Sequence, residues 1–160
     1  MTDIDGGGAV LLPGEARTID IGAFLVTVHA DAATTDGQFS LIETGESVEG
    51  GGPPLHIHRD CAESFVVLAG RYEMHVGGRV FECPAGSFVF VPKGTVHTFR
   101  TLDGGSRKLN LYTPAAMVGY FDELAEGIAR GMSEGDLDAI AGRYAMDVVG
   151  PVPESYLEPS

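Results

Sequence analysis

Two stretches of the 160-residue sequence decide how the rest is interpreted: residues 51–70, GGPPLHIHRDCAESFVVLAG, and residues 86–99, GSFVFVPKGTVHTF. Each places glycine and proline turn signals beside a run of β-branched and aromatic residues, which is typical of short strands joined by tight turns. The first stretch contains His56 and His58. Residues two apart in a strand lie on the same face, so both imidazoles are expected to point the same way.

Two further residues extend this histidine pair. Glu63 opens the next predicted strand, and His97 lies on a separate strand after a proline- and glycine-containing turn. Neutral imidazoles and a carboxylate are competent ligands for a divalent metal ion. An isolated histidine is more often a surface or hydrogen-bonded residue, and we interpret His29 and His75 in that way.

The sequence around these residues predicts an all-β body. Glycine accounts for 23 residues, about twice the average usage, and ten of them lie in pairs or triplets between β-like runs. Short strands at this spacing are typical of a sandwich or barrel. Strands are expected at residues 19–30, 38–46, 55–58, 63–69, 71–76, 79–83, 87–91, 95–102 and 108–113.

The pattern changes after Pro114, which fits the first turn of a helix. Apolar residues at helical spacing predict an amphipathic helix. They are Met117, Tyr120, Phe121, Leu124 and Ile128. Ser133 predicts the N-cap of a second helix that continues to Tyr144, and residues 151–160 are expected to form an irregular tail. We therefore divide the chain into a barrel with N-terminal strands at residues 1–113 and a C-terminal part at residues 114–160 packed on it.

Size and charge limit the function. A chain of 160 residues is the size of one domain, and a net charge of −13 disfavours nucleic acid and anionic membranes as partners. No stretch has 18 uninterrupted apolar residues, and the acidic N-terminus is unlike a signal peptide, so a cytoplasmic location is expected. Cys61 and Cys83 are expected to be reduced thiols.

The spacing of the glycines, prolines and candidate ligands resembles the two signature motifs of the cupin superfamily. The resemblance covers residues 38–113, and both motifs keep their order. The first is Gly50-x5-His56-x-His58-x4-Glu63-x6-Gly70, and the second is Gly86-x5-Pro92-x-Gly94-x2-His97. Thr101 stands where the second motif usually ends in asparagine, a position that is usually not a ligand.

This resemblance implies an antiparallel jelly-roll β-barrel with one divalent metal ion inside, held by His56, His58, Glu63 and His97. Donors of this kind suit Fe, Mn, Ni, Co, Cu or Zn, and the sequence does not choose among them. The chain is similar to small single-domain quercetin dioxygenase-like cupins. That similarity implies a metal-dependent dioxygenase acting on a small enolisable or flavonol-like substrate, and a homodimer.

Two other functions stay open from the sequence. One is a metal-dependent isomerase, cyclase, decarboxylase or hydrolase, and the other is a non-enzymatic cupin that binds a small molecule. Glu63 is the candidate catalytic residue, because a carboxylate can remain a ligand or become a base. Cys61, between His58 and Glu63, is either a fifth ligand or redox-sensitive group, or simply a loop side chain.

The candidate substrate pocket consists of apolar and aromatic residues expected to face the barrel interior near the ligands. Plain core packing is the alternative role for each of them. The candidates are Phe39, Leu41, Phe65, Val67, Tyr72, Met74, Phe99 and Tyr112.

Overall fold

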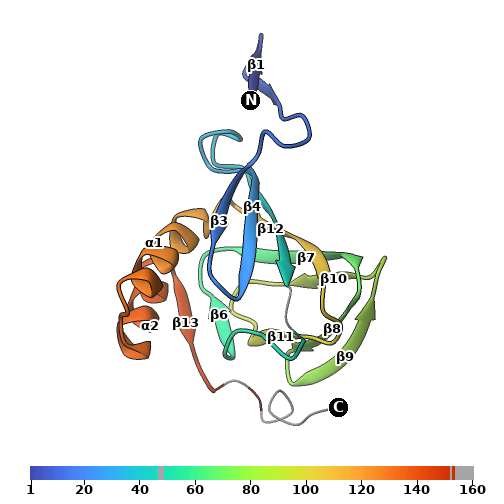
Figure 1. Ribbon diagram of the computed structural model, residues 1–160, viewed down its shortest axis with the longest axis vertical. Helices are drawn as coiled ribbons and strands as arrows, with labels where there is room; N and C mark the ends of the chain where they lie inside the picture. Colours follow the sequence, from blue (N-terminus) through green and yellow to red (C-terminus); the bar gives the residue numbers. More distant parts are fainter. Residues whose placement is uncertain (47–48, 152, 154–160) are drawn as a thin grey trace.

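The computed structural model describes residues 1–46, 49–151 and 153, and it is built mainly of β-strands (Figure 1). The first strands are β1 (Thr2–Ile4), β2 (Gly8–Val10), β3 (Arg17–Asp20), β4 (Phe24–Ala30), β5 (Ser40–Glu46) and β6 (His56–His58). The next are β7 (Ala62–Ala69), β8 (Arg71–Val76), β9 (Arg79–Pro84), β10 (Phe88–Val91), β11 (His97–Thr101) and β12 (Ser106–Thr113). Helices α1 (Val118–Ala129) and α2 (Glu134–Arg143) and strand β13 (Met146–Val148) follow.

Two antiparallel sheets form the body. The six-stranded sheet has the order β10-β7-β12-β5-β4-β3, and the five-stranded sheet has the order β13-β6-β11-β8-β9. Neighbours in the sheets are often far apart in sequence, as β7 and β12 are, which is the crossed connectivity of a jelly roll. The predicted all-β antiparallel fold with a short C-terminal helical part is confirmed.

Alternation along the strands sets the inner and outer faces. On β7, Glu63, Phe65 and Val67 are buried, whereas Val66 and Leu68 are exposed. A strand points successive side chains to opposite faces, so one face of β7 lines the interior and the other faces outward. This alternation brings the carboxylate of Glu63 inside the barrel.

Glycines shape the turns between these strands, as the spacing predicts. Gly50, Gly70 and Gly86 all have positive φ, at 85°, 69° and 91°. Gly70 shows the reason most clearly, because a Cβ atom there would lie 2.1 Å from Ser106 Oγ. The sharp junction of β7 and β8 therefore requires a residue without a side chain.

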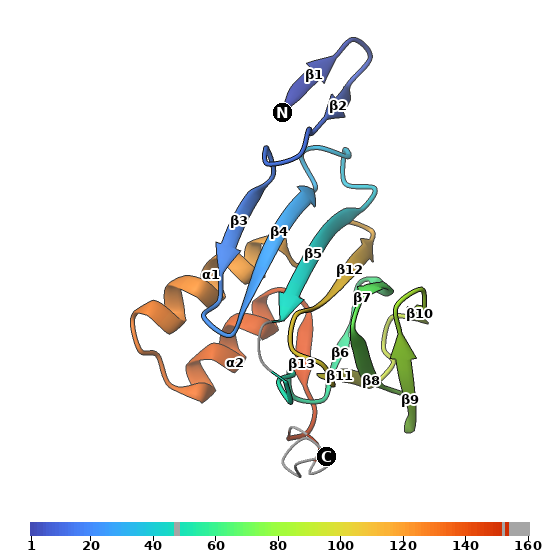
Figure 2. The ribbon, with the colours of Figure 1, turned by 45° about the vertical axis from the view of Figure 1, so that its right-hand side comes forward.

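Three parts of the chain before helix α2 differ from the sequence prediction. Residues 19–30 do not form one strand: β3 and β4 are separate, and Gly22 with a φ of 86° lies in the turn between them. The first ten residues contain the unpredicted hairpin β1-β2, which stands apart from the body in Figure 2. Pro114 precedes helix α1 by four residues rather than lying in its first turn.

The C-terminal part covers one side of the body, where α1 lies beside β3 and α2 packs against α1 and β13 (Figure 2). Met117, Val118 and Phe121 join a buried cluster with Ile19 and Val26 of the six-stranded sheet. The Ser133 hydroxyl accepts a 3.2 Å hydrogen bond from the Asp136 backbone N–H, which confirms the predicted N-cap.

The chain after α2 returns to the five-stranded sheet. Strand β13, where the sequence pattern predicts no element, pairs with β6 there. Of the predicted tail at residues 151–160, residues 152 and 154–160 lie outside the described part of the chain. Within the described part, neither helix is long and apolar enough to cross a membrane.

A buried charged cluster lies inside the barrel on β5, β8 and β12. Lys108 is fully buried, and its Nζ donates to Glu46 Oε1 at 2.8 Å and to Thr44 Oγ1 at 2.5 Å. The same ammonium lies 3.8 Å above the Phe99 ring, and the Tyr72 hydroxyl donates to Glu46 Oε2. Both charges are thus paired and hydrogen-bonded, as burial requires.

Candidate metal centre

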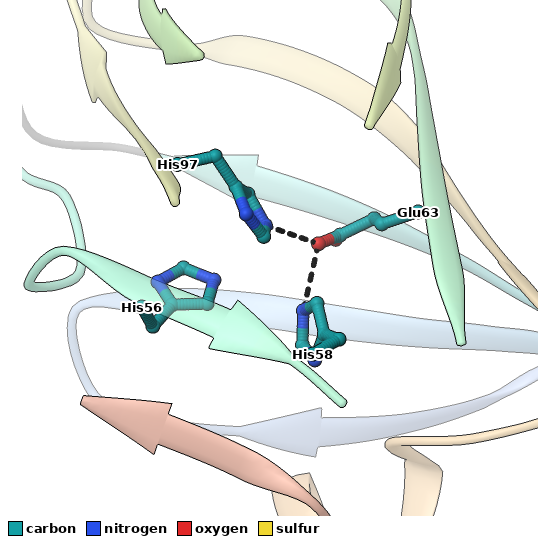
Figure 3. Close-up of side chains that lie close together, drawn as sticks. All are labelled: His56, His58, Glu63 and His97. Carbon is teal, nitrogen blue, oxygen red and sulfur yellow. Dashed lines mark hydrogen bonds and ion pairs between the residues drawn. The ribbon is translucent and has the colours of Figure 1, made fainter. Parts of the chain in front are cut away.

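Four side chains from three strands converge inside the barrel (Figure 3). His56 and His58 come from β6, Glu63 from β7 and His97 from β11. One ligand atom from each residue lies within 4.8 Å of the others, and the four residues are only 2% to 6% exposed. The structure therefore brings the four predicted ligands together.

Strand pairing explains the convergence. His97 is directly opposite His56 in the register between β11 and β6, and their ring centroids are 4.3 Å apart. His58 lies on the same face of β6, two residues further along. Glu63 approaches from the opposite sheet, so donors from the two sheets meet in the interior.

One oxygen of Glu63 is the common point of contact. Its Oε2 lies 2.9 Å from His58 Nε2 and 3.0 Å from His97 Nε2 (Figure 3). Burial alone would raise the pKa of the Glu63 carboxyl, but the hydrogen bonds and positive charge of the two histidines outweigh it and hold that pKa well below its usual range. Glu63 is thus an ionised carboxylate at neutral pH and can serve as a metal ligand.

Backbone carbonyls fix two of the imidazoles. His56 Nδ1 lies 2.8 Å from the Pro54 carbonyl oxygen, and His97 Nδ1 lies 2.8 Å from that of Thr95. A carbonyl only accepts, so Nδ1 carries the proton in both rings. In each neutral ring Nε2 then presents a lone pair to the centre, which is the usual arrangement of a metal-ligating histidine.

These contacts fit a cation at the centre. In a neutral His97 the only ring proton is the one that Nδ1 donates to the Thr95 carbonyl. The lone pair of Nε2 would then lie 3.0 Å from Glu63 Oε2, and these two electron-rich atoms would repel each other. A second proton on His97 relieves this one contact. Burial lowers the pKa of His97, but its hydrogen bond to Glu63 and the carboxylate charge outweigh burial and raise it. A divalent ion would satisfy all four donors together, so the residues present fit a metal.

His56 should make the metal-free protein sensitive to acid. Burial, with the charge of His97, lowers the pKa of His56 to about 4 from 6.5. As the pH falls below 6.5, His56 is protonated in the unfolded chain but stays neutral in the folded chain until about pH 4. The free energy of unfolding therefore decreases across this pH window. Between pH 7 and about pH 4.5 we expect wild type to lose about 2–3 kcal/mol more than His56→Gln. Urea unfolding with chelator present measures this difference, and equal losses would contradict it.

His58 is held differently from the other two histidines. Its Nδ1 is buried and has no hydrogen-bond partner among the described residues, whereas His56 and His97 are anchored through Nδ1. Anchoring by an outer hydrogen bond typically contributes about 10–100-fold to metal affinity. The Co(II) dissociation constant of His58→Ala is therefore expected to be at least about tenfold smaller than that of His97→Ala. Isothermal titration of both variants checks this order, and a larger loss for His58→Ala would refute it.

Strand β13 supports the strand that carries His56 and His58. In the five-stranded sheet, β6 lies between β13 and β11, and Asp147 is opposite Ile57. Asp147 also forms an exposed ion pair with Arg59. The C-terminal part thus completes the sheet around the ligand strand.

Breaking this pairing should loosen the site. Asp147→Pro removes a ladder N–H and the ion pair, whereas Asp147→Ala removes only the ion pair, which contributes little at a surface. We expect the free energy of unfolding of the proline variant to be about 1–3 kcal/mol lower than that of the alanine variant. We also expect the proline variant to bind Co(II) more weakly. Denaturant unfolding and metal titration of the pair test this, and identical behaviour would show that β13 does not support the site.

Six of the eight candidate pocket residues lie on inner faces of the barrel strands, where their contact with a substrate stays a prediction. Phe65 lies 6.5 Å from the His97 ring and 6.3 Å from the Phe99 ring, between centroids. The Tyr112 ring packs edge-on against His58 at 5.6 Å. The inner-face candidates are Phe65, Val67, Tyr72, Met74, Phe99 and Tyr112.

The placement of Phe39 and Leu41 corrects the prediction that they line this interior. On β5 the buried face carries Ile42, Thr44 and Glu46, so Leu41 points to the outer face. Phe39 precedes the strand, is exposed, and lines a surface hollow near the N-terminal hairpin. Both faces of this strand mix polar and apolar residues, and the inner face proved to be the one whose Thr44 and Glu46 bind Lys108.

The structure also adds a residue that the sequence reasoning missed. The Asn110 side chain is buried on β12, and its Nδ2 donates a 3.0 Å hydrogen bond to Glu63 Oε1. Its signal in the sequence was a polar residue two positions before Tyr112, and therefore on the same face of the strand. Cys61 does not belong to the metal cluster, and burial raises the pKa of its thiol to about 11, which leaves it protonated.

Comparison with known proteins agrees with this geometry. The family model for the cupin domain matches residues 45–108. Quercetin 2,3-dioxygenase of Bacillus subtilis is 30% identical over 91 residues, which are 57% of this chain and 27% of that protein. The chain spans half or less of the length of the curated relatives it matches.

Solved structures share the fold at low sequence identity. The polyketide cyclase RemF of Streptomyces resistomycificus has a TM-score of 0.56 and 22% identity, covering 66% of this chain and 78% of its own. A nucleoside dehydratase from Streptomyces has a TM-score of 0.59 and 12% identity, covering 92% of this chain and 95% of its own. The match to the cupin-domain model, both sequence motifs and the crossed antiparallel barrel together support a cupin superfamily protein.

Proposed function

We propose that the protein is a metal-dependent dioxygenase acting on a small enolisable or flavonol-like substrate. The observation that carries the proposal is the convergence of three imidazoles and one carboxylate, all buried, with ligand atoms within 4.8 Å. Such a shell leaves one or two positions open on a five- or six-coordinate ion, which is what a catalytic site needs. When bound, a divalent ion there would supply Lewis-acid polarisation and, if redox-active, electron exchange with O2.

The protein's own residues would hold and surround the substrate. His56 and His97 keep fixed orientations through their backbone contacts, so the open positions have a defined direction. Phe65 lies beside His97, and Phe99, which is only partly buried, lies next to Phe65. Aromatic walls of this kind suit a flat, conjugated ligand that binds through oxygen.

The sequence relationship supports the dioxygenase reaction over other cupin reactions. The 91-residue match to a protein named quercetin 2,3-dioxygenase covers more than half of this chain. We therefore take quercetin as the flavonol probe for this site.

Oxygen uptake tests the proposal. Metal-free protein is loaded separately with Fe(II), Mn(II), Co(II), Ni(II), Cu(II) or Zn(II), mixed with quercetin, and followed with an oxygen electrode and by loss of flavonol absorbance. We expect equimolar loss of O2 and quercetin with at least one redox-active metal, and none with His97→Ala. Undiminished turnover without oxygen would exclude a dioxygenase, and tight quercetin binding without turnover would indicate a binding protein.

The donor set itself supports a second candidate, a metal-dependent isomerase, cyclase, decarboxylase or hydrolase. Three imidazoles and a carboxylate also suit Zn(II), which has no redox chemistry. A polyketide cyclase and a nucleoside dehydratase share the fold, which shows that the same barrel accommodates such reactions. Stoichiometric zinc in the native protein and oxygen-independent turnover would favour this candidate.

A further inference from the structure

The two carboxylate oxygens of Glu63 have different partners. Oε2 faces the ligand nitrogens of His58 and His97, at 2.9 and 3.0 Å. Oε1 instead accepts a 3.0 Å hydrogen bond from the side-chain amide of Asn110. Glu63 and Asn110 are each only 3% exposed, so water competes little for this bond.

The position of Asn110 is set by the sheet rather than by a loop. Strand β12 is paired on both sides, with β5 and with β7, and Asn110 lies opposite Phe65 in the register. The amide must turn Nδ2 toward Glu63, because its oxygen would repel the carboxylate. A rigid central strand therefore presents a donor to one oxygen of the glutamate.

Tyr112 stands next to this contact. It lies opposite Glu63 in the pairing of β12 and β7 and is 2% exposed. The edge of its ring packs against His58. Two side chains of one strand, Asn110 and Tyr112, thus lie next to Glu63, and Asn110 donates to the carboxylate oxygen that does not face the histidines.

We propose that Asn110 is a positioning residue that restricts Glu63 to binding metal through Oε2 alone. The proposal rests on the metal site proposed above and specifies how that site uses its carboxylate. Turning Glu63 to bind through both oxygens, or swinging it toward a substrate as a base, would break the bond to Oε1 and leave a buried amide donor unpaired. Glu63 is accordingly a fixed ligand, and the open positions of the metal remain free for substrate.

A matched pair of variants isolates the hydrogen bond. Asn110→Val and Asn110→Thr introduce side chains of nearly equal shape that both suit a strand, but only threonine keeps a donor. Each metal-free variant is titrated with Co(II), and the dissociation constant and visible absorption of the bound Co(II) are recorded. Leu109→Ala, the neighbouring position on the opposite face of β12, serves as the control, and thermal unfolding without metal checks that all variants fold.

We expect Asn110→Val to weaken Co(II) binding about 10–100-fold and to change the Co(II) absorption as Glu63 gains freedom. Asn110→Thr should retain most of the affinity and the wild-type spectrum, and Leu109→Ala should match wild type. Wild-type behaviour of Asn110→Val would overturn the proposal. Equal changes in the valine and threonine variants would also overturn it, because they would show an effect of side-chain size.

A measurement on the unaltered protein keeps the proposal testable whether or not the variants fold. The infrared difference spectrum between Co(II)-loaded and metal-free protein reports the two carboxylate stretching bands, whose separation is wide for binding through one oxygen and narrow for binding through two. A wide separation supports the role of Asn110, and a narrow one overturns it. If wild type binds no Co(II), the metal site itself fails and this proposal fails with it.

Discussion

His97→Ala should reduce Co(II) affinity more than about a hundredfold, because it removes a ligand whose outer hydrogen bond alone is typically worth about 10–100-fold. His97 is 2% exposed and anchored on the Thr95 carbonyl, and its Nε2 lies 3.0 Å from Glu63 Oε2. No other described imidazole stands close enough to replace it in the cluster. Competition against a chromogenic chelator measures the loss.

Two histidines outside the cluster provide controls for this experiment. His29 is partly exposed with its Nε2 3.6 Å from Glu43, and His75 lies 2.9 Å from a Glu73 oxygen. His29→Ala and His75→Ala remove the same chemical group without touching the centre, so both should keep wild-type affinity. If either weakened binding as much as His97→Ala, the ligand assignment would be wrong.

Glu46→Gln should be among the most destabilising single changes in the barrel. It leaves the fully buried ammonium of Lys108 without its carboxylate, and breaking one partner of a buried pair typically costs about 3–5 kcal/mol. Burial already lowers the pKa of Lys108, and removing the carboxylate charge of Glu46, which opposes this shift, would lower it further. The melting temperature should fall on the order of 10 °C.

The control for this prediction removes both charges together. A Glu46→Leu/Lys108→Met double variant leaves no unpaired charge, and replacing a buried pair by apolar residues is often neutral or stabilising by about 1–4 kcal/mol. It should be more stable than Glu46→Gln in denaturant unfolding, although the Tyr72 hydroxyl loses its acceptor. A loss below about 1 kcal/mol for Glu46→Gln would mean that the pair is not a structural requirement.

Local spacing predicted most strands and the shared face of His56 and His58, whereas the full set of four candidate ligands came from the resemblance of two separate motifs to cupins. His56 and His58 share a face because a strand has a period of two, and the turn glycines Gly70 and Gly86 carry the positive φ that their spacing implies. These features depend on residues close together in sequence. The same holds for the helix cap at Ser133.

Features that depend on distant contacts were not predictable in the same way. The inner face of β5 carries Thr44 and Glu46, which bind Lys108 more than 60 residues away, so Leu41 was assigned to the wrong face. Strand β13 is stabilised by pairing with β6 rather than by its own three residues. Asn110 became visible only when β12 was placed beside Glu63.

The central claim is that His56, His58, Glu63 and His97 bind one divalent metal ion. Elemental analysis by mass spectrometry of protein purified without a metal-chelating column, beside a His56→Ala/His58→Ala double variant, tests it most directly. We predict close to one equivalent of Fe, Mn, Co, Ni, Cu or Zn per chain in wild type and loss of that metal in the variant. Equal metal content in the two proteins, or none in wild type after reconstitution, would contradict the claim.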